Sequence, residues 1–151
     1  METDDLTTAQ GIRRQFFALR NGLLADTLRK GGMDQKYIFG LQLPQIKELS
    51  ARVREAVGES DIMTTVRDLW ADRECREARL LAIHLMDSSK TDMEEALSMA
   101  ANIRTREEAD ILAFRLVRFL PEAAEIANRL DRQDSPLLQY AAVAIRRFIQ
   151  Q

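Results

Sequence analysis

The chain has 151 residues and a mass of 17.3 kDa, which is long enough for one domain with a hydrophobic core. It carries 22 basic and 24 acidic residues, a net charge of −2, and 46% of it is hydrophobic. These values exclude a disordered chain, a collagen and a strongly basic nucleic-acid tail.

One cysteine, Cys75, and one histidine, His84, exclude an internal disulfide framework and a multi-cysteine or histidine-built metal site, so we expect no metal and no cofactor. Arg73 and Arg76 flank Cys75 and would favour a modestly acidified thiol, but no histidine or aspartate pattern surrounds it, so we treat this thiol as incidental.

The first residues, 1–5, are acidic and lack the basic and apolar regions of a signal peptide. The longest stretches without a charge, 37–46 and 135–145, are much shorter than the roughly 20 apolar residues of a membrane span. We therefore expect a cytoplasmic protein that has no membrane role.

The hydrophobic pattern predicts an all-helical chain, because no useful run alternates between apolar and polar residues. Apolar residues recur with helical spacing over residues 8–30, and Gly31 and Gly32 end this predicted helix. A second helix is predicted over residues 44–58.

Helix start signals recur in the rest of the chain. Capping boxes are predicted at Thr91 and Thr105, each with a glutamate three residues later. Pro121 opens another helix, and Ser135 caps one that begins with Pro136. The first helices of three predicted pairs then begin near Ser60, Thr91 and Leu120, and the second helices begin near Glu74, Thr105 and Ser135.

A period of about 30 residues with two helices in each repeat is typical of a HEAT-like or armadillo-like α-α superhelix, or solenoid. We expect about eight helices in a single domain over residues 1–151. Residues 1–58 would form the N-terminal helices, and residues 60–151 three two-helix repeats. An irregular helical bundle is the alternative.

Two segments carry a family resemblance. Residues 36–49 read KYIFGLQLPQIKEL, and Leu69-Trp70 is followed at residues 77–82 by EARLLA. Their order and separation are similar to those in the DNA alkylation repair enzyme family, the HEAT-like alkylpurine DNA glycosylases. The resemblance covers about residues 16–151. It implies a helical-repeat fold and hydrolytic removal of an alkylated purine from DNA without a cofactor.

The resemblance also identifies a catalytic segment, in which a tryptophan is followed four residues later by an aspartate. The matching residues here are Arg106 and Asp110, so the aspartate is kept and the tryptophan is replaced. A family arginine one repeat later is replaced by Tyr140, or by Gln139 if the register slips. A further family tryptophan has no counterpart before Gln151, and we expect a shortened version of the family.

These replacements bear on catalysis. Cleavage of the N-glycosidic bond of a cationic base needs an anion beside the developing oxocarbenium sugar, and Asp110 could supply it. Substrate binding also needs aromatic faces and cations for phosphates. Arg106 lies one helical turn before Asp110 on the same face, so we expect this guanidinium to pair with the carboxylate. The sequence therefore favours a protein without intact glycosylase activity.

Alignment of the repeats places Arg79, Asp110 and Tyr140 at equivalent positions on successive second helices, and thus in a row on one surface. An ion pair between Arg79 and Asp110 would make this row purely structural. The functional interpretation is a nucleic-acid surface on which arginines face phosphate. Its candidate binding residues are Arg76, Arg79, Arg106, Tyr140 and Arg147.

The last helix has apolar residues on more than one face, among them Val143, Phe148 and Ile149. A solenoid normally ends in a repeat with a polar outer face. We therefore expect a homodimer through the C-terminal helices.

The sequence leaves three functions open. The first is a non-catalytic module that binds double-stranded DNA, or a residual DNA repair module. The second is a scaffold that takes a protein partner on its concave face and has no nucleic-acid role. The third is an active alkylpurine DNA glycosylase that uses Asp110.

Overall fold

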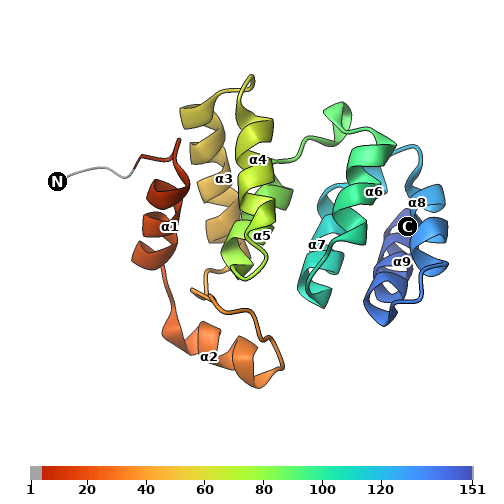
Figure 1. Cartoon of the computed structure of the whole chain (residues 1–151), viewed down its shortest axis with the longest axis horizontal. Helices are drawn as coiled ribbons and strands as arrows, with labels where there is room; N and C mark the ends of the chain where they lie inside the picture. The colour runs from red at the N-terminus through yellow and green to blue at the C-terminus, as the bar shows by residue number, and fades with distance from the viewer. Residues whose placement is uncertain (1–4, 151) are drawn as a thin grey trace. The chain divides into compact units, whose positions relative to one another are not determined.

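The computed structural model describes residues 5–150 and divides the chain into two compact units, Met1–Leu85 and Met86–Gln151 (Figure 1). Within the described residues there are nine α-helices, two short 3-10 helices and no strand. One isolated parallel bridge joins Tyr37 to Cys75. The predicted all-α class is confirmed. No helix in residues 5–150 is long and apolar enough to cross a membrane.

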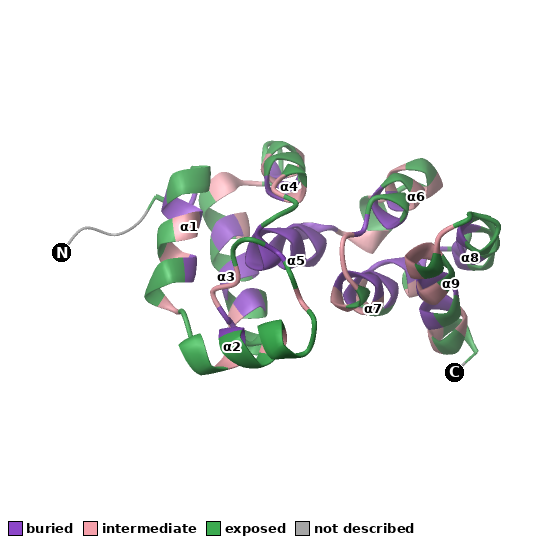
Figure 2. Cartoon of the chain, turned by 60° about the horizontal axis from the view of Figure 1, so that its bottom comes forward, coloured by how far each residue is buried: buried purple, intermediate pink, exposed green. Residues whose placement is uncertain are grey.

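The first unit contains five helices: α1 (Ala9–Ala18), α2 (Gly22–Lys30), α3 (Leu43–Val57), α4 (Ile62–Ala71) and α5 (Arg76–Leu85). Helix α5 packs against both α3 and α4 and is buried along its whole length, as Figure 2 shows. Charged residues of α5 are buried together with its leucines, so their charges must be satisfied inside the protein.

The prediction of one helix over residues 8–30 is wrong, because the chain breaks between α1 and α2. The Asn21 side chain accepts a hydrogen bond from the Leu24 N–H and caps α2. The Asn21 N–H donates to the Phe39 carbonyl oxygen at 2.8 Å, a bond to a loop that is distant in the sequence. With this break, residues 5–150 contain nine α-helices where about eight were predicted for the chain.

The second unit contains α6 (Met93–Ala101), α7 (Arg106–Arg115), α8 (Ala123–Asp131) and α9 (Pro136–Ile149). The short helix η1 (Ser88–Lys90) precedes α6, and η2 (Val117–Phe119) joins α7 to α8. Helix α9 packs against both α7 and α8. Its buried Ala141, Ala142, Ala144 and Ile145 lie on the face that these contacts cover.

The predicted repeat spacing is confirmed in the helix boundaries. Second helices begin at Arg76, Arg106 and Pro136, at intervals of 30 residues. The first helices, α4, α6 and α8, begin at Ile62, Met93 and Ala123. A superhelix remains a prediction, since the first pair belongs to one unit and the other two pairs to the second.

Two of the three side-chain caps predicted in this part of the chain are present. Ser135 accepts from the Leu138 N–H, and Thr105 accepts from the Glu108 N–H at 3.1 Å. Glu108 reaches back to the Arg104 N–H, one residue earlier than a standard capping box requires. The box at Thr91 is wrong by one position: Asp92 caps α6 and accepts from the Glu95 N–H, because an aspartate competes well for that role.

Candidate nucleic-acid interface

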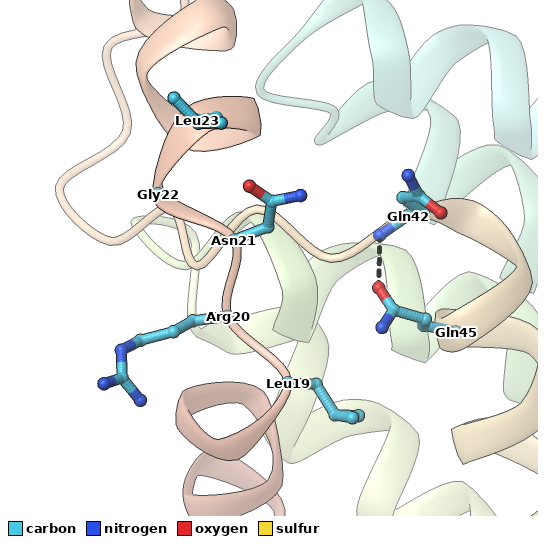
Figure 3. Close-up of a pocket in the computed structure, with 7 residues that line it drawn as sticks. All are labelled: Leu19, Arg20, Asn21, Gly22, Leu23, Gln42 and Gln45. Carbon is cyan, nitrogen blue, oxygen red and sulfur yellow. Dashed lines mark hydrogen bonds between the residues drawn. The ribbon is translucent and has the colours of Figure 1, made fainter.

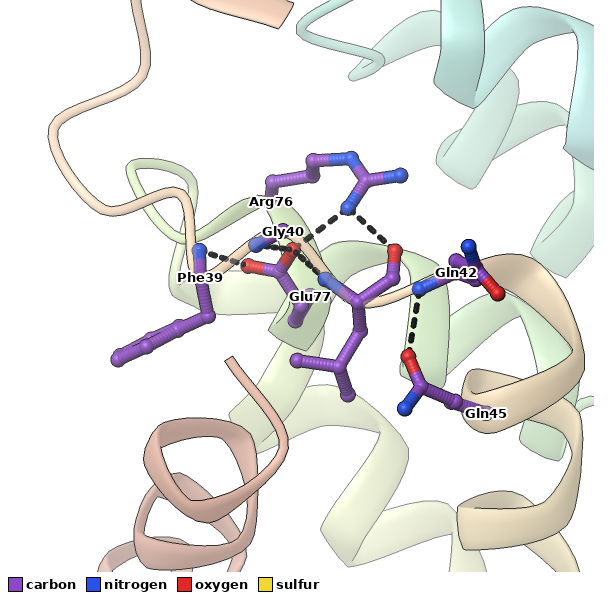
Figure 4. A network of polar contacts seen from close by, with 7 residues as sticks. Phe39, Gly40, Gln42, Gln45, Arg76 and Glu77 are labelled. Atoms are coloured by element: carbon purple, nitrogen blue, oxygen red, sulfur yellow. Dashed lines mark hydrogen bonds and ion pairs between the residues drawn. The ribbon is translucent and has the colours of Figure 1, made fainter. Parts of the chain in front are cut away.

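The segment that resembles the family most closely folds around one buried carboxylate, Glu77 (Figure 4). Its Oε1 accepts the Phe39 N–H at 2.9 Å, and its Oε2 accepts the N–H groups of Gly40 and Leu41 at 3.1 and 3.4 Å. Arg76 donates from Nη1 to Oε2 at 2.6 Å and to the Leu41 carbonyl oxygen at 2.9 Å. The carboxylate and guanidinium therefore fix the loop before α3 onto α5.

Gly40 lets this loop pass close to the start of α2. Its φ is +85°, and a Cβ there would lie 2.2 Å from the Asn21 carbonyl oxygen and 2.9 Å from the Ala25 nitrogen. Both the conformation and the close approach require glycine. The phenylalanine, glycine and glutamate of the two family-like segments thus have a structural role in this unit.

Two of the predicted phosphate-binding arginines, Arg76 and Arg79, are buried in the first unit. Arg76 is bonded to Glu77 and Leu41 as described. The Arg79 guanidinium carbon lies 3.3 Å from the centroid of the Trp70 ring, and Arg79 also donates to the Trp70 carbonyl oxygen. Trp70 is half-buried beneath this guanidinium. Both arginines therefore belong to the interior of the first unit and not to its exposed surface.

The Cys75 thiol is not acidified by the arginines that flank it in the sequence. Cys75 is fully buried at the start of α5, and burial raises the pKa of the thiol to about 12. The cost of burying a thiolate exceeds the opposing effect of the positive charge on Arg13. Cys75 is a core residue.

An open pocket of about 690 Å³ lies between the starts of α2 and α3 (Figure 3). Asn21, Gln42 and Gln45 are among the residues that line it. The Asn21 side chain accepts the Leu24 N–H at the start of α2, and the Gln45 side chain accepts the Gln42 N–H at the start of α3. The Arg20 side chain extends away from Gln42 and Gln45. The Asn21 and Gln45 side chains therefore serve helix capping.

In the second unit, the structure brings together Asp110 of α7 and Tyr140 of α9. The Tyr140 hydroxyl lies 2.9 and 3.0 Å from the two carboxylate oxygens of Asp110. The two residues are 30 positions apart, so their contact follows from the repeat alignment. The expected partner of the carboxylate was Arg106. Its guanidinium carbon instead lies 4.8 Å from the centroid of the Tyr140 ring.

The hydrogen bond to Asp110 raises the pKa of Tyr140, because a phenolate could not donate to the carboxylate and would repel it. The positive charges of Arg106 and Arg147 oppose this shift. Tyr140 is consequently a neutral donor at neutral pH, and the carboxylate of Asp110 is its acceptor.

Arg106 and Arg147 are exposed on this part of α7 and α9. Within residues 5–150 neither guanidinium makes a hydrogen bond or ion pair. Elsewhere in the unit, Arg129 pairs with Glu125 and Arg146 pairs with Asp131. We call Arg106, Asp110, Tyr140 and Arg147 the α7–α9 cluster. It contains two cations that are available to an anionic ligand.

The C-terminal helix exposes apolar side chains, as the sequence suggested. Val143 is 52% exposed and Ile149 is 36% exposed. Homodimerisation through this helix remains a prediction.

Sequence analysis missed a second group of residues beside the α7–α9 cluster. Phe114, Phe119 and Phe148 surround the guanidinium of Arg118. The available signal was the sequence FRLVRF over residues 114–119, which holds two phenylalanines and two arginines near the end of a predicted helix. It was overlooked because phenylalanine is normally assigned to the core.

The described residues, 5–150, thus form an all-helical protein whose second unit carries aromatic and arginine side chains on α7 and α9. A family model described as DNA alkylation repair enzyme matches residues 12–151. The chain therefore belongs to the DNA alkylation repair enzyme family, and the predicted resemblance is confirmed. No curated protein and no solved structure matches the chain.

Proposed function

We propose that this member of the family binds DNA without excising a base, and that the α7–α9 cluster contacts the phosphates. The observation that carries the proposal is the hydrogen bonding of Asp110. Its two carboxylate oxygens accept the Tyr140 hydroxyl, at 2.9 and 3.0 Å.

For chemistry, the carboxylate that the family resemblance assigns to catalysis is engaged by a neutral phenol. A glycosylase needs this anion to face the developing oxocarbenium sugar, or to position the attacking water. The position four residues before Asp110 holds Arg106, so the tryptophan of the family pattern is also missing. Both features argue against hydrolysis.

For binding, the tyrosine hydroxyl leaves Arg106 without a carboxylate partner. An exposed arginine that pairs with no acidic residue keeps its full charge and its forked set of N–H donors for a phosphate. Arg147, on the adjacent helix, is exposed in the same way. Two such cations support a local phosphate-binding surface on a chain whose net charge is −2.

The test uses duplex DNA that contains 7-methylguanine, with binding followed by fluorescence anisotropy and base release by chromatography. We expect binding at low salt and no release by the native chain. Release by the native chain but not by Asp110→Asn would establish the alternative of an active glycosylase. Absence of binding at low salt would remove both DNA functions and leave the protein-interaction scaffold.

A further inference from the structure

Three phenylalanines gather around one arginine at the end of α7. The Arg118 guanidinium carbon lies 4.1 Å from the ring centroid of Phe114, 4.4 Å from that of Phe119 and 5.9 Å from that of Phe148. The rings of Phe114 and Phe148 meet edge to face at 5.3 Å. We call these four residues the Arg118 cluster.

The arginine is held in place, but most of its donors are open. Its Nε donates to the Phe114 carbonyl oxygen at 2.6 Å. Within the described residues, 5–150, this is its one hydrogen bond, and it forms no ion pair. The two Nη groups therefore remain available in a guanidinium whose position is fixed by rings. A guanidinium held in one orientation can donate two parallel hydrogen bonds to two oxygens of a phosphate.

The rings themselves are exposed. Phe119 is 57% exposed and Phe114 is 45% exposed. Burial of an aromatic side chain away from water is favourable, so the exposure of both rings has a cost in free energy. Packing inside the second unit does not account for this exposure. A cation beside exposed aromatic faces is the arrangement that proteins use to hold nucleotides, with a base on the ring and a phosphate on the cation.

The Arg118 cluster continues the α7–α9 cluster. Phe114 lies one helical turn after Asp110 on α7, and Phe148 lies two turns after Tyr140 on α9. The rise along α7 from Arg106 to Phe114 is about 12 Å. The guanidinium of Arg118 lies over the Phe114 ring, so Arg106 and Arg118 are the cations at the two ends of this strip. A ligand that carries several phosphates can contact both clusters at once.

We propose that the Arg118 cluster binds an unpaired nucleotide within a DNA strand, with the base against Phe119 or Phe114 and a phosphate on Arg118. The inference rests on the proposed DNA binding and deepens it. An exposed ring can stack on a base only when that base is outside a paired duplex stack, so the cluster selects single-stranded or gapped DNA.

The test compares binding of a labelled 12-nucleotide oligothymidylate with binding of a labelled 12-base-pair duplex, by anisotropy at low salt. We expect tighter binding of the single strand. Phe119→Ala should weaken it by about 5- to 150-fold, the usual effect of losing one stacked base. Arg118→Gln should weaken it as well, and Arg118→Lys should restore only part of the loss because lysine lacks the fork.

The first unit offers matched controls. Arg20 lies 3.8 Å from the ring centroid of Phe17, which is 57% exposed, and donates to the Phe17 carbonyl oxygen. Phe17→Ala and Arg20→Gln therefore remove an equivalent contact elsewhere and should leave binding unchanged. Circular dichroism of every variant would exclude unfolding as the cause of a loss.

Three results would overturn the inference. If the duplex binds and the single strand does not bind more tightly, the proposed function stands and the unpaired-nucleotide site falls. If neither DNA binds, both fall. If polyglutamate displaces the oligothymidylate at a lower concentration than unlabelled oligothymidylate does, the cluster is assigned to an acidic protein partner instead.

Discussion

Replacement of Glu77 by glutamine tests whether the family-like segment is built around a buried carboxylate. The side chain of Glu77 is fully buried and accepts three backbone N–H groups and the Arg76 guanidinium. Glutamine keeps the volume but replaces one acceptor oxygen with an amide donor and removes the negative charge. Arg76, whose side chain is 4% exposed, then loses its ion pair with the Glu77 carboxylate at 2.6 Å.

Loss of one partner from a buried ion pair destabilises a protein by about 3–5 kcal/mol. The loss acts on a unit of 85 residues, Met1–Leu85, for which a denaturant slope of about 1.5 kcal/mol/M is reasonable. The urea midpoint of this unit should therefore fall by about 2 to 3 M. The single tryptophan, Trp70, lies in the same unit, so its fluorescence reports the transition directly.

Glu59→Gln is the matched control in the same unit. Glu59 forms a 2.8 Å ion pair with Arg54, but its side chain is 53% exposed, and pairs of this kind contribute under about 1 kcal/mol. A midpoint for Glu77→Gln that lies as close to the native value as that of Glu59→Gln would refute the reasoning.

Four further predictions follow from the structure. Gly40→Ala should destabilise the first unit more than Gly58→Ala does in urea unfolding, because both glycines have a φ of +85° but only Gly40 has backbone atoms within 3 Å of a Cβ; equal effects would show that the close approach is unimportant. The Cys75 thiol should resist alkylation at pH 8 in the folded protein and react after denaturation, since burial raises its pKa to about 12, and rapid reaction in the native state would contradict its burial. Tyr140 should ionise above the ordinary tyrosine range, so that its stabilising bond to Asp110 is complete below about pH 10 and is lost as the pH rises through the raised pKa. In an ultraviolet titration, Tyr140→Phe should remove a tyrosine transition that lies above the ordinary range, and a titration curve unchanged by the substitution would disprove the assignment. The homodimer predicted through the C-terminal helices should give a dimer mass by light scattering at tens of micromolar, whereas a monomer mass would remove it.

Local signals in the sequence were sufficient for most helix boundaries. Thr105 and Ser135 each cap the helix that follows within three residues, so their chemistry can be recognised without tertiary structure. The 30-residue period also gave the adjacency of Asp110 and Tyr140. These features depend on neighbours in the chain or on equivalent positions in successive repeats.

The features that were missed depend on contacts between distant segments. The break before Asn21 occurs where the loop around Gly40 passes close to the start of α2. The burial of Arg76 depends on the Glu77 carboxylate, which also accepts N–H groups of that loop. Charged residues on a helix are normally assigned to solvent, which made Arg79 a candidate ligand for phosphate. The pairing of Asp110 with Tyr140 rather than Arg106 depends on side-chain geometry that the repeat period does not specify.

The salt dependence of duplex DNA binding tests the proposed function most directly. The logarithm of the binding constant should fall linearly with the logarithm of the salt concentration, because each phosphate contact releases condensed counterions. For the double variant Arg106→Gln, Arg147→Gln, the slope should be smaller by about 2, one for each lost contact. The control is the double variant Arg129→Gln, Arg146→Gln, which removes the same number of positive charges. These two arginines already form ion pairs with carboxylates, so the slope should stay nearly unchanged. A native slope close to zero, or equal slopes for the two double variants, would contradict DNA binding by the α7–α9 cluster.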